Sequence, residues 1–322
     1  MSTSGPLGSL YDADYREMRE GAAAFEAVRD FLVLSGPDAL DYMQGQCSQD
    51  LSSLEPGQSV DALVLEPQGK INSMVRVTRS GDAELLVDVA GGWGDHLEGR
   101  LRRFMLRVRV TMERRSWRVI SLRGAKVLEL IDRAQLPAGT ALVLDVPWPQ
   151  IVGVDLVGET PEVPSGVRRC MDTAWDAVRI EAGLPVMGAE LDGRTIPTEA
   201  GLIDNCVSMT KGCYTGQELV ARLDARGNRV PRRLQGVVAG RSVALGCLAA
   251  GTELCWQGRG NEARDAGRVT SAAWSPGMQA MVGLAYVRRE VPVPGSVEAL
   301  GRPGCPGRLA VEVRNLPMIP PS

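Results

Sequence analysis

The chain has 322 residues, more than one ordinary hydrophobic core can organise, so we expect two or three domains. Hydrophobic residues make up 44% and charged residues 23% of the sequence, as in a globular protein. The formal net charge of −3 argues against a dedicated nucleic-acid-binding protein. No stretch of about 18 apolar residues is free of charges, and the first residues show no secretory signal. We therefore expect a cytoplasmic protein without a membrane-spanning helix.

Cysteine and histidine are too few and too scattered for the usual metal sites. The seven cysteines form no Cys-x-x-Cys pair, and their odd number does not suggest a disulfide framework. His96 is the single histidine, which leaves no histidine-rich zinc site. It falls beside the apolar stripe of an expected helix, so we expect it to face solvent. We predict no metal site.

Strands and helices alternate through the first third of the chain. Phe31 to Leu34 reads as a buried strand, and the turn after it leads into a helix with Asp38 as the expected N-cap. Pro67-Gln68-Gly69-Lys70 reads as the turn of a hairpin between apolar strands. The elements expected after this hairpin are a strand at 85–89, a helix at about 94–105 and a strand at 107–110.

The middle third repeats this alternation, whereas the last third changes in texture. The elements expected in the middle are strands at 117–122, 141–146 and 151–157, and helices at 125–134 and 172–183. From about residue 234, short apolar runs are separated by Gly, Pro, Ser and Asn, which favours a small all-β barrel or sandwich. Together these patterns predict α/β or α+β layers followed by a β domain.

The stretch K-G-C-Y-T-G-Q-E-L-V-A-R, from Lys211 to Arg222, concentrates residues with chemical potential. Thr215 and Glu218 have the spacing of a capping box, so a helix is predicted to begin just after Thr215. Cys213 then lies near Lys211 and the positive end of that helix, and both would favour its thiolate. A glycine-rich loop around a small buried cysteine is the structural alternative, and the residues alone leave both open.

The segment K-G-C-Y-x-G-Q-E resembles the motif of the YgfZ family of folate-binding proteins, whose mitochondrial relatives help to mature iron–sulfur proteins. Arg179-Ile180-Glu181-Ala182-Gly183 resembles a stretch shared with the glycine-cleavage T-protein. Three further segments, 34–39, 44–46 and 67–71, resemble the N-terminal half of the same superfamily. The likeness runs from about residue 30 to residue 240.

This resemblance implies an α+β, T-protein-like fold with three lobes around a central folate cleft. We expect an N-terminal α/β lobe at 1–115, which need not be continuous in sequence, and a second α/β lobe at 116–233 that carries the cysteine loop. A C-terminal β-barrel is expected at 234–322. The ligand that the resemblance implies is tetrahydrofolate or a derivative.

The resemblance also assigns roles to residues. Glu181 matches the T-protein glutamate that grips the pterin, because a carboxylate accepts parallel hydrogen bonds from a 2-aminopyrimidinone edge. Arg222 is the candidate to meet the folate's glutamate carboxylates, its alternative being a surface pair with Glu218. Cys213 is the functional thiol and would share a pterin-sized hollow with Glu181. The other residues expected to shape the site are Lys211, Tyr214 and Gln217.

The function implied is support of iron–sulfur cluster assembly or repair in client enzymes, tRNA-modifying ones among them. T-proteins carry an aspartate in the hairpin after the glycine turn, whereas 69–75 holds no carboxylate here. We therefore do not expect a glycine-cleavage aminomethyltransferase, and whether the protein is an enzyme stays open.

Two other functions remain as alternatives. One is a folate-dependent one-carbon transferase or demethylase. The other is an RNA-binding module that uses the arginine-rich stretches 100–118 and 222–233. The expected partners are a folate and iron–sulfur client or assembly proteins. Nucleic acid is a less favoured partner, and no membrane is expected.

Overall fold

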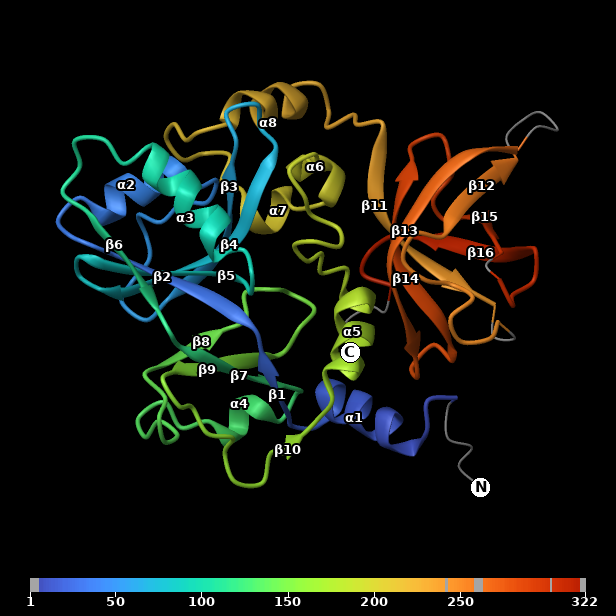
Figure 1. The fold of residues 1–322 in the computed structure, drawn as a ribbon, viewed down its shortest axis with the longest axis horizontal. Coiled ribbons are helices and arrows are strands. Elements are labelled where there is room, and N and C mark those ends of the chain that lie inside the picture. Colours follow the sequence, from blue (N-terminus) through green and yellow to red (C-terminus); the bar gives the residue numbers. More distant parts are fainter. Residues whose placement is uncertain (1–5, 241–242, 258–262, 302, 319–322) are drawn as a thin grey trace.

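The computed structural model describes residues 6–240, 243–257, 263–301 and 303–318, which form two sheets and a barrel (Figure 1). The first sheet is antiparallel, in the order β3-β4-β5-β2-β6. Its strands are β2 (Arg29–Ser35), β3 (Ser59–Leu65), β4 (Ile71–Gly81), β5 (Glu84–Ala90) and β6 (Thr111–Arg115). Two helices, α2 (Ala39–Gln46) and α3 (Gly94–Arg103), bury their apolar residues in one core with this sheet.

The second sheet has the order β10-β1-β7-β9-β8 and takes one strand from the start of the chain. Its strands are β1 (Ala23–Ala27), β7 (Arg118–Arg123), β8 (Leu142–Asp145), β9 (Gly153–Gly158) and β10 (Arg168–Arg169), and a short helix, α4 (Val127–Leu130), packs beside β9. Because β1 pairs with both β7 and β10, the N-terminal residues complete a sheet whose other strands lie about a hundred residues later.

The C-terminal part is a closed six-stranded barrel in the order β11-β14-β13-β12-β15-β16. Its strands are β11 (Arg232–Ala239), β12 (Glu253–Gln257), β13 (Ala263–Ser275), β14 (Ala280–Arg288), β15 (Gly295–Leu300) and β16 (Arg308–Arg314). Closure leaves no unpaired strand edge, which is how a small all-β domain avoids edge-to-edge association. The barrel expected from the texture of this region is confirmed.

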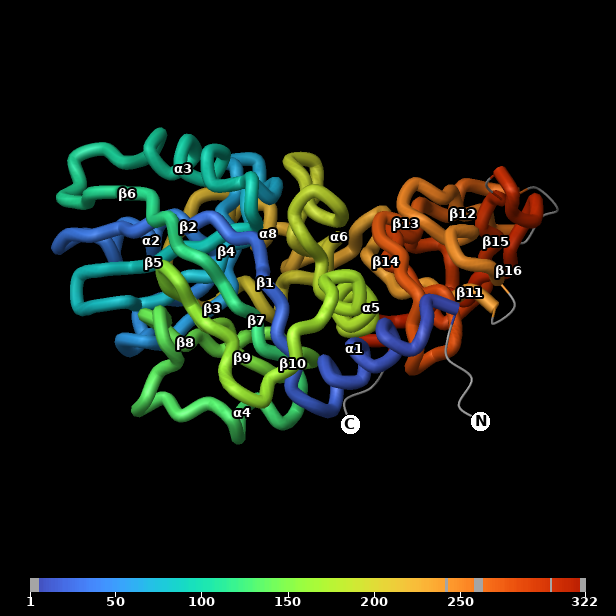
Figure 2. The backbone as a smooth tube through the Cα atoms, turned by 60° about the horizontal axis from the view of Figure 1, so that its bottom comes forward, coloured from blue at the N-terminus to red at the C-terminus, as the bar shows by residue number. Residues whose placement is uncertain are grey.

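Helices α1 (Ser9–Glu20), α5 (Asp172–Ala182) and α6 (Pro197–Ala200) lie between the two sheets and the barrel (Figure 2). Of the remaining helices, α7 (Ile203–Cys206) packs on β3, and α8 (Gln217–Asp224) lies above β3 and β4 at the top of Figure 1. The central helix, α5, packs on α1 on one side and on β13 and β14 of the barrel on the other. Among the described residues, no helix is both long and apolar enough to span a bilayer.

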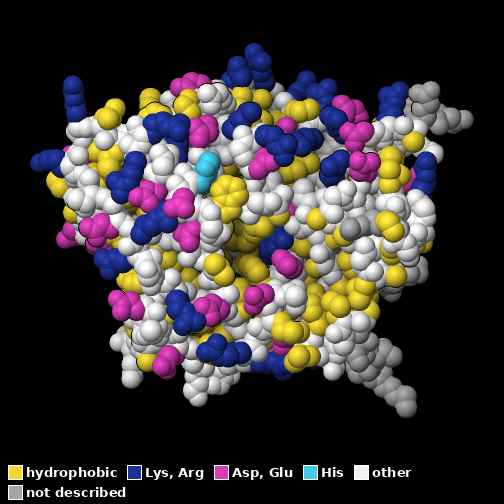
Figure 3. All heavy atoms as spheres, in the orientation of Figure 1, with side chains coloured by type: hydrophobic (Ala, Val, Ile, Leu, Met, Phe, Trp, Pro, Cys, Tyr) yellow, Lys and Arg dark blue, Asp and Glu magenta, His cyan; other side chains and the backbone are white. Residues whose placement is uncertain are grey.

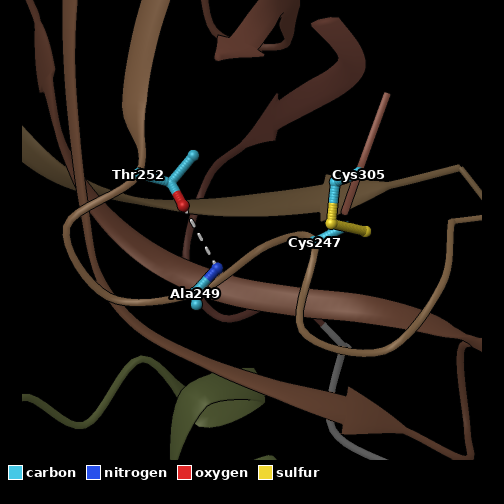
Figure 4. Close-up of a disulfide and its surroundings, with 4 residues drawn as sticks. All are labelled: Cys247, Ala249, Thr252 and Cys305. Carbon is cyan, nitrogen blue, oxygen red and sulfur yellow. Dashed lines mark hydrogen bonds between the residues drawn. A yellow bond between two sulfur atoms is a disulfide. The ribbon is translucent and has the colours of Figure 1, made fainter. Parts of the chain in front are cut away.

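Several sequence predictions need correction. Residues 107–110 form no strand, because β6 begins only at Thr111, and the helix expected at 125–134 is limited to the four residues of α4. The structure also contains one disulfide, between Cys247 and Cys305 in the barrel domain, although the cysteine pattern suggested none (Figure 4). The pair closes a loop of 58 residues, so spacing along the chain gave no signal for it.

Candidate ligand-binding site

A cavity of about 170 Å³ lies where the two sheets meet the segment that follows α5. The surface is hollowed near the centre of the face shown in Figure 3, with hydrophobic side chains on the walls. The largest apolar side chains that line the cavity are Phe25, Met74, Trp148, Trp175, Leu184 and Met187. A concave, mostly apolar and aromatic site with a few polar groups is the usual form of a small-molecule site.

The floor of the cavity is an ionic network that joins the two sheets. Arg76 on β4 donates from Nε to Asp88 Oδ2 at 2.9 Å and from Nη1 to Asp155 Oδ2 at 2.7 Å. Arg29 Nε donates to Asp88 at 2.7 Å, and Arg123 on β7 lies 2.9 Å from Asp155. Burial alone would raise the pKa of Asp155, but Arg123 and Arg76 hold it well below its usual range. The charges are therefore paired, as buried charges must be.

Asp61 also lines this cavity, but it forms no hydrogen bond or ion pair with the ionic network. It lies on β3 directly opposite Arg76 and lines the cavity. Its carboxylate takes part in no hydrogen bond with the described residues, whereas Asp88 and Asp155 accept several. Burial raises the pKa of Asp61 to about 6, against the opposing charges of Arg76 and Arg29. The Asp61 carboxylate is therefore a hydrogen-bond acceptor at the cavity that has no donor among the described residues.

Arg123 forms another part of the wall. Its guanidinium carbon lies 5.1 Å from the ring centroid of Trp175 and 5.6 Å from that of Phe25, in cation–π contacts that hold the aromatic side chains in place. Its Nε has no hydrogen-bond partner among the described residues. The wall thus has fixed aromatic surfaces and one buried, unpaired donor.

Glu181 does not line this cavity. It lies on α5 with no exposed surface, and the Tyr15 hydroxyl donates to its two carboxylate oxygens at 2.9 and 3.1 Å. Ser275 on β13 lies close enough to oppose the rise in the pKa of this carboxylate, and Arg19 Nη1 lies 3.9 Å away. Burial, the largest influence, raises the pKa of Glu181. Its side chain thereby connects α1, α5 and the barrel.

The exposed Cys213 lies in the loop that precedes α8, the helix labelled at the top of Figure 1, while Glu181 is on the central helix, α5. Neither residue is among those that line the cavity. The expectation that both face one pterin-sized hollow is therefore corrected: the carboxylate is enclosed by α1 and the barrel, and the thiol is open to solvent.

Lys211 binds the loop that contains Cys213 to the C-terminal end of α2. Its Nζ donates to the backbone carbonyl oxygens of Gln44, Cys47 and Gln49 at 2.6, 2.8 and 2.9 Å. These carbonyls lie at and just after the C-terminal end of α2, where a lysine satisfies unpaired acceptors and opposes the helix dipole. The same ammonium lies 5.2 Å from the centre of the buried Tyr214 ring. Lys211 thus holds the backbone on either side of Cys213.

The start of α8 differs from the predicted capping box. The helix begins at Gln217, and Gly216 occupies the N-cap position with φ 85° and no side-chain cap. A Cβ at Gly216 would lie 2.5 Å from the carbonyl oxygen of Glu66, so the close approach of the hairpin requires glycine. Gln217 instead accepts a hydrogen bond from the backbone N–H of Tyr214 at 3.1 Å.

Arg222 lies on the exposed side of α8. The expected alternative, an ion pair with Glu218, is not formed within the described part of the chain. Its guanidinium is therefore available to a group outside the protein.

The residues of the ionic network were missed by sequence reasoning. A signal for them existed, because Arg76 and Asp155 interrupt strands that are otherwise rich in valine and leucine. A charge inside a buried strand implies a partner on a neighbouring element, but the sequence does not name that partner.

Comparison with known proteins gives consistent relatives, although no family model matches the chain. An uncharacterized protein of Haemophilus influenzae is 27% identical over 196 residues, which cover 60% of this chain and just under two thirds (65%) of that relative's length. The tRNA-modifying protein YgfZ of Yersinia pestis is 29% identical over 262 residues, which cover 75% of this chain and 77% of the relative. An aminomethyltransferase of Rubrobacter xylanophilus is 26% identical over 328 residues, which cover 89% of this chain and 85% of that relative.

A solved structure has the same fold. The glycine cleavage system aminomethyltransferase T from Bartonella henselae matches with a TM-score of 0.77 at 20% sequence identity, over 98% of this chain and 90% of the other. The match confirms the expected α+β fold, with two sheets and a C-terminal barrel.

Proposed function

Because this chain belongs to the superfamily of YgfZ proteins and aminomethyltransferases, we propose that it binds a reduced folate in the cavity between its two sheets. In this proposal it supports iron–sulfur cluster assembly or repair in client enzymes, including tRNA-modifying ones. The observation that carries the folate part is a cavity that combines aromatic walls with the unpartnered carboxylate of Asp61.

The residues at this cavity fit the ring system of a folate. A pteridine is flat and aromatic, and one edge carries adjacent N–H donors. Trp148, Trp175 and Met187 offer apolar surface to the ring, and Asp61 offers an acceptor to the donor edge. A bound folate would supply one-carbon chemistry, while these residues would bind and orient the ring.

Cys213 is the proposed functional thiol, and its exposure suits a reaction or contact with a client protein. In this proposal Lys211, Tyr214 and Gln217 act on the thiol rather than on the folate, since their contacts all stabilise the loop around it. Arg222 is proposed to meet carboxylates of the folate tail or of the partner, because no intramolecular ion pair occupies it among the described residues.

The test uses titration calorimetry with tetrahydrofolate and client-enzyme activity in cells that lack the native protein. Cys213→Ala should keep folate affinity and lose support of the client. Cys255→Ala, which removes another free and less exposed cysteine, serves as the control and should change neither. If the wild type binds no tetrahydrofolate, the proposal fails, and if Cys213→Ala supports clients normally, the thiol has no such role.

A second candidate, a folate-dependent one-carbon transferase, is favoured by the match to an aminomethyltransferase along 89% of the chain. The hairpin turn speaks against a glycine-cleavage activity, because residues 69–75 supply no carboxylate. The discriminating measurement is product formation from tetrahydrofolate and a methylamine donor. Turnover that survives Cys213→Ala would favour the transferase over the maturation factor.

A further inference from the structure

The unpartnered carboxylate at the cavity suggests how a ligand is recognised, a point that rests on the proposed folate site. Asp61 shares one face of β3 with Leu63 and Leu65, whose side chains are fully buried, and with Ser59 at the start of the strand, so it lies where the apolar part of this face ends. An ionisable group placed there lowers the stability of the fold unless something in the cavity compensates for it.

The neighbouring arginines do not compensate for it by direct bonds. Arg76 uses Nε and Nη2 on Asp88 and Nη1 on Asp155, and Arg29 is also bonded to Asp88. Asp61 lies beside the network and balances its charge, since three arginines there face only two bonded aspartates, but it accepts none of their hydrogen bonds. Its oxygens are therefore available to the cavity.

The chemistry of the walls narrows the class of ligand. Apart from the three arginines, most of the large side chains around the cavity are aromatic or thioether, so the apolar walls favour a flat ring over a flexible polar chain. A carboxylate is satisfied most completely by two adjacent N–H groups in one plane, which form parallel charge-assisted hydrogen bonds. A 2-amino-4-oxopyrimidine edge, as in a pteridine, has this pattern of donors.

We infer that Asp61 is the group that grips the amino-pyrimidinone edge of the bound ring. It takes the role that the family resemblance assigns to Glu181. Glu181 already accepts hydrogen bonds from the Tyr15 hydroxyl, and it lies on the helix that packs between α1 and the barrel.

The experiment compares two ring fragments on the full-length protein by titration calorimetry. Pterin carries the 2-amino group, whereas lumazine has a carbonyl oxygen in its place, which would face the carboxylate. The wild type should bind pterin at least about tenfold more tightly than lumazine, the factor expected for loss of a charge-assisted pair. Asp61→Asn and Asp61→Leu should both reduce this ratio to within about threefold of unity.

Glu181→Gln is the matched control, because it neutralises a carboxylate that lies outside the cavity, and it should keep the wild-type ratio. Circular dichroism identifies any variant that fails to fold, and the second Asp61 variant then carries the test. If the Asp61 variants keep the wild-type preference for pterin over lumazine, or if only Glu181→Gln removes it, this inference is wrong. The proposal that the protein binds a folate would still stand. Wild-type protein that binds neither pterin nor tetrahydrofolate would contradict the proposed function itself.

Discussion

At the scale of single residues, Asp61 is a partly buried carboxylate whose ionisation the fold disfavours. Its pKa is about 6 instead of the ordinary 3.8, because burial outweighs the attraction of Arg76 and Arg29. For an acid whose pKa is raised on folding, the ionised form is the disfavoured one. Stability is therefore lost as pH rises from about 4 through 6.

Asp61→Asn should consequently stabilise the ligand-free protein at pH 7.5 by about 1 to 3 kcal/mol, the size that a pKa difference of this order implies. The gain should be nearly gone at pH 4, where the wild-type carboxyl group is protonated in the folded state and close to half protonated in the unfolded state. Urea unfolding at the two pH values measures the difference. An equal effect at both would show that Asp61 does not titrate in this way.

Lys211 illustrates a residue whose role the structure redefines. Substitution by Met removes three hydrogen bonds to carbonyls around the end of α2. We expect the free energy of unfolding to fall by about 1 to 3 kcal/mol, because buried acceptors lose their donor. Reaction of Cys213 with a thiol reagent should change in rate in Lys211→Met, while Lys70→Met at the exposed hairpin turn should leave both properties unchanged.

At the scale of elements, α1 is held on α5 by a buried polar contact. Tyr15 brings a hydroxyl to Glu181, whose pKa is raised by burial. Tyr15→Phe leaves this carboxylate short of a donor and should cost about 1 to 3 kcal/mol. In a double-mutant cycle with Glu181→Gln, the double variant should lose less unfolding free energy than the sum of the losses in the two single variants. Strict additivity, measured by urea unfolding, would mean that the two side chains do not interact.

Several elements could be predicted from the sequence, and the failures have physical reasons. The buried runs of β2 and β5 and the turn at 67–70 were predicted because apolar patterning and turn residues act locally. The capping box at Thr215 failed because Gly216 adopts a left-handed conformation that admits the hairpin. The helix α1 was not predicted at all, since its apolar side chains, Tyr11, Tyr15 and Met18, are few among many charges.

The candidate site could not be assembled from the sequence because its residues come from different sheets. Asp61 and Arg76 belong to the first sheet and Asp155 to the second, and only the packing of the sheets brings them together. Family resemblance pointed to Glu181, since the motif around it is preserved. It could not show that Tyr15, far away in sequence, takes up that carboxylate.

At the scale of the whole molecule, the ionic network connects the two sheets that enclose the cavity. Arg76→Met would leave Asp88 and Asp155 with fewer partners in a buried site and should destabilise the protein by about 3 to 5 kcal/mol. The low pKa of Asp155 predicts the pH dependence: its stabilising effect is present above about pH 4 and is lost as pH falls below that value. Arg194→Met, at an exposed pair with Asp192, should change stability little by comparison.

The central claim is that the space between the two sheets holds a folate ring by way of Asp61. A crystal structure of the wild-type protein with tetrahydrofolate tests it most directly. We predict density for the pteridine among Phe25, Trp148 and Trp175, with its 2-amino group within hydrogen-bonding distance of the Asp61 carboxylate. A ring bound elsewhere, or with its amino edge on Glu181 after displacement of Tyr15, would contradict the claim.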